Sequence, residues 1–157
     1  MASDNSQLIS QKQSQKSSYQ SSVNSKQSTY NNNKAKIERL KKVKATLETQ
    51  KGYANERYKN IKSYVESSNF SINWTGNNAD KTKKNISEKI VSAYKSYVGE
   101  IDRHLDAVCD EITRIENENY RLNGDILRLR SWINDLTNEI EKLFNWKELV
   151  KAWALLE

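Results

Sequence analysis

The chain has 157 residues, a net charge of +6 and 36% hydrophobic residues, below the share of roughly 45–50% in ordinary globular domains. It has no proline and only four glycines, so the composition argues against a compact multilayer core and favours long solvated helices with one apolar stripe. Cys109 is the only cysteine, so no internal disulfide can form. His104 is the only histidine, and a metal site or a Cys/His catalytic site would need a third partner that the sequence does not suggest. We predict no cofactor and no enzymatic activity.

Positive charge gathers in the first half of the chain. Residues 1–70 contain 13 Lys/Arg and 5 Asp/Glu, whereas residues 71–157 contain 13 and 15. A basic half beside a slightly acidic half is most simply explained by two helices that attract each other along their flanks. The alternative is a nucleic-acid-binding arm built on the basic residues between 34 and 44, but no recognition motif accompanies the charge. We therefore predict a solvated basic face and no nucleic-acid partner.

The sequence shows no export signal and no membrane span. Its first residues, Met1 to Gln7, contain no basic residue and no apolar segment, which argues against a signal peptide. No stretch approaches the roughly 20 apolar residues that cross a bilayer. We expect a cytoplasmic protein without membrane insertion. If it is secreted, we expect it to leave with a partner and without a cleavable signal peptide.

Residues 5–67 predict the first long helix. Candidate core positions recur there in the alternating steps of three and four that define a heptad. Apolar residues fill many of these positions from Ile37 onward. Residues 10–34 are almost all Ser, Gln, Lys, Asn and Tyr, so we expect that part to be helical only when something packs on it. The predicted core positions are Ile9, Lys12, Lys16, Tyr19, Val23, Lys26, Tyr30, Asn33, Ile37, Leu40, Lys44, Leu47, Lys51, Ala54, Tyr58, Ile61 and Val65.

Residues 68–77 interrupt the helical pattern and predict a bend. Trp74 and Gly76 are its distinctive pair, because a glycine permits a positive φ and a tryptophan beside it can bury a large apolar area over the junction. Asn77 and Asn78 offer N-cap side chains to the next helix.

Residues 78–145 predict the second helix, whose continuation to 155 is left open. From Val108 its apolar positions alternate in steps of four and three, and only Asn119 is polar, a residue type that can fix the register of a coiled coil. The predicted fold class is all-α: two long antiparallel helices form a coiled-coil helical hairpin with a W-x-G bend, a single unit over residues 1–157.

One irregularity is predicted in the second helix. Two successive steps of four, from Tyr97 to Ile101 and on to Leu105, mark a stutter beside Gly99, where we expect local unwinding or a bend. The predicted core positions before Val108 are Ile86, Ile90, Tyr94, Tyr97, Ile101 and Leu105.

The two helices do not match in polarity far from the bend. Folding back at Trp74 pairs positions whose numbers sum to roughly 147, so the apolar row of the second helix faces the polar residues 11–25. A long apolar stripe usually marks an interaction surface, so we expect this stripe to stay open in the chain alone until a second copy or a partner helix covers it. Beyond Leu143, two tryptophans suggest a helical anchor, and the alternative is a tail that folds back or is not native. The predicted partner-binding residues are Leu122, Ile126, Leu129, Ile133, Leu136, Ile140, Leu143, Trp146 and Trp153.

Trp74-Thr75-Gly76 resembles the W-x-G turn of the WXG (ESAT-like) small helical proteins of the bacterial type VII secretion system. Over about residues 5–145, the long helices, the Ser/Gln/Lys-rich first helix and the run from Trp74 to Ala79 most resemble the YwqH-like members, which are encoded beside LXG toxins in Gram-positive bacteria. The resemblance implies a non-enzymatic targeting factor or chaperone that binds the helical LXG domain of a toxin for export, with a second small helical targeting protein as a further partner. The alternative is a self-associating structural coiled coil, and a homodimer is left open.

The resemblance also implies a composite secretion signal, in which the bend acts together with a Y-x-x-x-D/E or F-x-x-x-D motif near the end of the second helix. No tyrosine in this sequence has an acidic residue four positions later. The nearest match is Phe144 with Glu148, one helical turn apart. The alternative is that Phe144 packs in the seam and Glu148 is a solvated charge.

Overall fold

The computed structural model describes residues 2–67 and 76–154, and nearly all of them are helical. Helix α1 runs over Ala2–Glu66, α3 over Asn77–Asn85, the π-helical segment η1 over Ile86–Val91 and α4 over Ser92–Ala154. No strand occurs in the described part of the chain, and the predicted all-α helical hairpin is confirmed. The absence of proline explains why the helices are this long, since no residue in their interiors lacks a backbone N–H.

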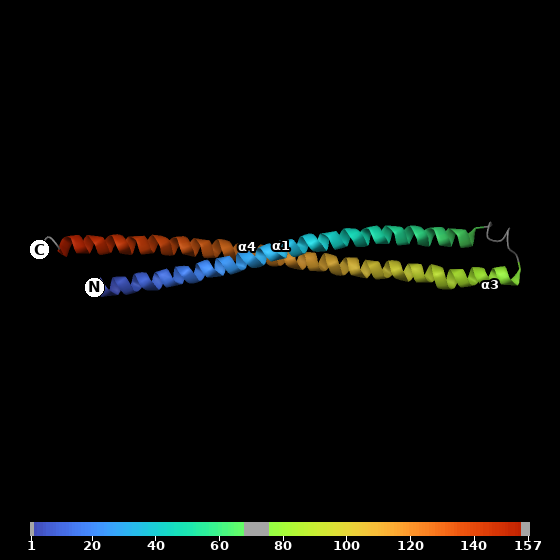
Figure 1. The fold of residues 1–157 in the computed structure, drawn as a ribbon, viewed down its shortest axis with the longest axis horizontal. Coiled ribbons are helices and arrows are strands. Elements are labelled where there is room, and N and C mark those ends of the chain that lie inside the picture. Colours follow the sequence, from blue (N-terminus) through green and yellow to red (C-terminus); the bar gives the residue numbers. More distant parts are fainter. Residues whose placement is uncertain (1, 68–75, 155–157) are drawn as a thin grey trace. The chain divides into compact units, whose positions relative to one another are not determined.

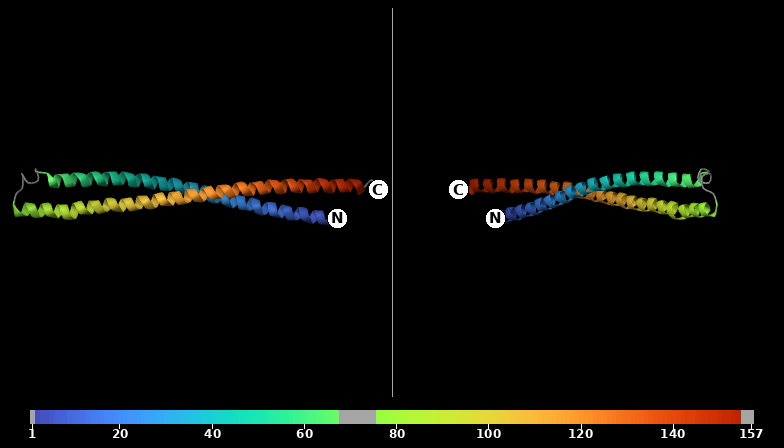
Figure 2. Two further views of the ribbon diagram at one scale, coloured as in Figure 1. Left: turned by 180° about the vertical axis from the view of Figure 1, so that it is seen from behind. Right: turned by 45° about the vertical axis from the view of Figure 1, so that its right-hand side comes forward.

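The chain divides into two compact units, each of which contains one segment of α1 and a later segment of the chain. Unit 1 comprises Met1–Ala35 and Ile115–Glu157, and unit 2 comprises Lys36–Arg114. Within each unit the two segments lie side by side and run antiparallel, as the blue and red segments of unit 1 show (Figure 1, Figure 2).

The heptad predicted for α1 is confirmed along its whole length. Every predicted core position from Ile9 to Val65 is buried or half-buried, including the lysines. Lysine can occupy such a position because its methylene stem packs on apolar surface while the ammonium group reaches water. Lys26 illustrates this in unit 1, where its Nζ lies 2.8 Å from Oδ2 of Asp125 on α4.

The irregularity in the second helical stretch lies at a different place from the predicted one. Ile90 and Tyr97, both predicted core positions, are exposed, whereas Val91 and Val98 are half-buried. From Val91 onward the covered positions follow an unbroken alternation of three and four, so the predicted stutter between 97 and 105 is wrong. The step that breaks the pattern is the five-residue step from Ile86 to Val91, which coincides with η1. A π-helical turn absorbs one extra residue and returns the following positions to the same face.

No helix in the described ranges, 2–67 and 76–154, has an apolar stretch long enough to cross a membrane.

Candidate functional site

Only the last two residues of the predicted bend, 76 and 77, are described. Trp74 lies outside the described residues, together with the rest of 68–75. Gly76 has a φ of 101°, a conformation that favours glycine, and occupies the N-cap position of α3. Its carbonyl accepts the first helical hydrogen bond, from the backbone N–H of Asp80 at 3.2 Å. The predicted N-cap role of Asn77 and Asn78 is wrong, because both lie inside α3 and no side chain caps it.

The predicted partner-binding seam of α4 is covered within unit 1. The expectation that this stripe stays open in the chain alone is therefore wrong. The seam residues that are buried are Ile126, Leu129, Leu136 and Ile140. The seam residues that are half-buried are Leu122, Ile133 and Leu143.

The polar first segment of α1 covers the seam with rings and aliphatic stems. Val23 packs with Ile126 and Leu129 in a buried cluster, and Tyr19 and Ile133 pack against it. Lysine stems and tyrosine rings occupy core positions of the Ser/Gln/Lys-rich stretch, while nearly all of its serines and glutamines are exposed. This stretch therefore covers apolar groups despite its polar composition.

Ion pairs hold the flanks of the covered seam. Lys12 Nζ lies 2.5 Å from Oε2 of Glu139, and the pair of Lys26 with Asp125 lies about four helical turns nearer the amino end of α4. The hydrogen bond from Lys26 lowers the pKa of the Asp125 carboxyl. These pairs join the basic first half of the chain to the acidic second half, as the charge distribution predicted.

An exposed apolar patch lies near the end of α4. We call Trp146, Leu149, Val150 and Trp153 the tail patch; their side chains are 59%, 56%, 43% and 74% exposed, and they line an open groove of about 310 Å³. The seam position between them is Lys147, which is half-buried and donates a hydrogen bond from Nζ to Oγ of Ser6 at 3.1 Å. Of the predicted partner-binding residues, Trp146 and Trp153 are therefore the two at a free surface.

Phe144 and Glu148 are both exposed and lie one turn apart on α4. The alternative that Phe144 packs in the seam is not realised, because Leu143 occupies the covered position. Phe144 is not among the residues that line the groove of the tail patch.

Sequence reasoning missed a second groove in unit 1, of about 320 Å³. Its wall is a tilted aromatic pair, Tyr19 on α1 and Trp132 on α4, with ring centroids 5.4 Å apart. Gln15 Nε2 donates a hydrogen bond to the Tyr19 hydroxyl at 2.9 Å. The sequence signal for this groove was Trp132, which directly precedes the seam residue Ile133 and so places a large ring at the flank of the helix pair.

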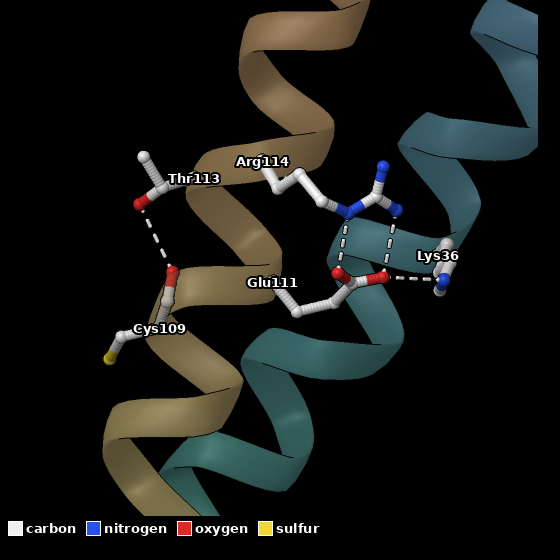
Figure 3. A network of polar contacts seen from close by, with 5 residues as sticks. All are labelled: Lys36, Cys109, Glu111, Thr113 and Arg114. Atoms are coloured by element: carbon white, nitrogen blue, oxygen red, sulfur yellow. Dashed lines mark hydrogen bonds and ion pairs between the residues drawn. The ribbon is translucent and has the colours of Figure 1, made fainter.

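Unit 2 contains a solvated charge network that joins its two helical segments. Glu111 accepts hydrogen bonds from Nε of Arg114 at 2.7 Å and from Nζ of Lys36 at 2.8 Å (Figure 3). These bonds lower the pKa of Glu111 to about 2. In the same view, Thr113 donates its hydroxyl hydrogen bond to the backbone carbonyl of Cys109, an ordinary helical contact. The network joins α1 to α4 and uses part of the basic run that was considered for nucleic-acid binding.

Metal-ligating groups do not cluster anywhere in residues 2–67 and 76–154. Cys109 is a free, half-buried thiol, five residues from His104 on the same helix.

Comparison with known proteins gives one match. The sequence model of the YwqH-like family matches residues 14–138, which include all of unit 2 and the seam from Leu122 to Leu136, and stop before Ile140 and the tail patch. No curated protein and no solved structure matches the chain. Since the match covers well over half of the sequence, the chain belongs to the YwqH-like family.

Proposed function

We propose that the chain is a non-enzymatic targeting factor, which binds the helical LXG domain of a toxin and accompanies it to the type VII secretion system. Membership of the YwqH-like family supports this proposal, together with the W-x-G sequence at the bend. The observation that carries it is the tail patch, an exposed apolar surface on a helix that is otherwise covered along its seam.

The tail patch has the composition of a protein-docking surface. Tryptophan is enriched among residues that dominate binding energy, and the two tryptophans flank Leu149 and Val150 in one groove. Full burial of a large apolar side chain contributes about 1.5–3 kcal/mol, so covering these four half-exposed side chains would contribute about 3–6 kcal/mol. An apolar helix face of the toxin is a suitable occupant.

The covered seam defines how a second contact with the toxin would form. Leu122 and its successors reach a partner only if that partner replaces the first segment of α1. This segment offers one buried aliphatic, Val23, within the Ile126 cluster, and it leaves Nδ2 of Asn33 and Oδ1 of Asn119 buried without hydrogen-bond partners among the described residues. A helix with aliphatic residues at these positions would pack better.

The secretion signal and the second partner belong to the same proposal. Trp74 and Gly76 at the bend, with Phe144 and Glu148 near the end of α4, are the residues we assign to the composite signal. A second small helical targeting protein would bind the toxin beside this chain.

Co-expression with the LXG-domain protein from the same gene neighbourhood tests the proposal. We expect a stable complex, which is lost when Trp146 and Trp153 are both changed to glutamate. Tyr53→Glu is the matched control, because Tyr53 is 64% exposed in unit 2 and should tolerate the same charge without loss of binding. Recovery of the chain as a solitary monomer beside a folded LXG domain would contradict the proposal.

The alternative function is a self-associating structural coiled coil, and the tail patch also favours it, since two copies could cover each other's tryptophans. Light scattering separates the two functions. A homodimer that persists at micromolar dilution and ignores the LXG domain supports the alternative.

A further inference from the structure

The outward face of α4 in unit 1 has an uncharged row that the covered seam does not explain. Its exposed positions recur in steps of three and four from Asn117 to Asn138, opposite the seam, where a solvated helix normally has its charges. Charged residues make up 29% of the whole chain and none of this row. The members of the row are Asn117, Tyr120, Gly124, Leu127, Ser131, Asn134 and Asn138.

The centre of the row combines two exposed apolar side chains with a glycine. Tyr120 is 83% exposed and Leu127 is 58% exposed, and they lie four residues before and three residues after Gly124, on one face. Gly124 lies inside a regular helix, and a Cβ added there would meet nothing within 4 Å. Glycine disfavours a helix more than any residue except proline, and nothing within the chain requires it here. A glycine between two apolar side chains allows the backbone of another helix to approach closely.

The edges of the row are basic beside its centre, whereas the acidic Glu116 and Asp135 lie on the edges nearer its two ends. Arg121, Arg128 and Arg130 are exposed beside it. Arg121 and Arg130 make no ion pair with a described residue, and Arg128 has only a 3.9 Å contact with Asp125. An occupant of this surface should therefore have acidic residues along its edges.

A second copy of the chain does not fit this charge pattern. A twofold axis that set Leu127 of one copy on Gly124 of the other would bring Arg121 of one copy beside Arg128 of the other, because both arginines lie on the same edge of the row, and like charges across an interface oppose association. The occupant that fits is a different helix.

We propose that the outward row of α4, centred on Tyr120, Gly124 and Leu127, is a docking surface for a partner helix that is apolar along its centre and acidic along both edges. The surface is separate from the tail patch, and it does not depend on the partner being a toxin.

Binding of two synthetic peptides to the full chain tests the inference by fluorescence anisotropy. Both peptides are four-heptad helices with the same leucine and alanine face, and the edges are glutamate in one and lysine in the other. We expect the acidic peptide to bind at least about tenfold more tightly at low salt, with a smaller difference at high salt because exposed charges are screened. Equal binding of the two peptides, or no binding of either, would overturn the inference.

Variants locate the contact. Leu127→Glu should abolish binding of the acidic peptide, whereas Trp146→Glu in the tail patch should leave it unchanged. Gly124→Ala should raise the melting temperature of the free chain and lower its affinity for the acidic peptide at least about threefold. A purely structural glycine would not give this combination. Unchanged affinity in Leu127→Glu would refute the proposed position.

Two other occupants are outcomes of the same experiment. A dimer of the chain alone that Leu127→Glu dissociates would overturn the inference in favour of a second copy. Binding of phosphatidylglycerol vesicles that Leu127→Glu abolishes, with no binding of either peptide, would overturn it in favour of a lipid surface.

Discussion

Replacing Ile126 with alanine tests whether α1 really closes the seam of α4 in the chain alone. Ile126 is 3% exposed and packs with Val23 and Leu129, so truncation removes three buried carbon atoms and leaves a gap between two helices. Such a change lowers the free energy of unfolding by about 2–4 kcal/mol. The neighbouring Leu127 is 58% exposed, and its truncation to alanine should cost less than about 1 kcal/mol, because most of its surface is already in water.

The assay is urea denaturation of each variant followed by circular dichroism. We expect Ile126→Ala to lower the transition midpoint clearly and Leu127→Ala to change it little, both at an unchanged slope. If the first segment of α1 were detached and the seam open, Ile126 would behave like its neighbour. Equal small effects of the two truncations would therefore refute the closed seam and restore the open stripe expected from the sequence.

Three further predictions concern charge, a buried amide and two glycines. Hydrogen bonds, chiefly from Arg114, lower the pKa of Glu111 from 4.5 to about 2. The ionised Glu111 therefore contributes its full stabilisation above pH 4.5, and this stabilisation is lost as the pH falls toward 2. In Glu111→Gln, the midpoint of urea unfolding should depend less on pH over this window. Asn119→Leu should stabilise the chain by about 1–2 kcal/mol in thermal melts, because it removes a buried unpaired oxygen, and a loss of stability would mean that this amide is hydrogen-bonded in solution. Gly76→Ala should lower the free energy of unfolding by about 1–2 kcal/mol, because Gly76 has a positive φ. Gly52→Ala, inside α1, should raise the free energy of unfolding by about 1 kcal/mol. Equal melting temperatures of the two variants would contradict both predictions.

The heptad of α1 shows how much of the fold can be predicted from the sequence. Its core positions from Ile9 to Val65 were predictable even where lysine fills them, because the spacing of three and four holds regardless of residue type. The same reasoning failed at Tyr97, because a π-helical turn shifts the register without leaving a signature in composition. The exposure of Trp146 and Trp153 was predictable, since both lie beyond the last apolar core residue that α1 offers in the antiparallel pairing.

The sequence by itself determined two long helices, the core row of the first and that of the second from Ile101 onward, because helical periodicity is a local property of the chain. Only the tertiary structure decided that the seam around Ile126 is covered, and that Tyr19 and Trp132 share a groove. The physical reason is that burial depends on the side chains across the helix pair. A lysine stem or a tyrosine ring counts as polar in a sequence pattern but covers apolar surface when it lies on the inner face.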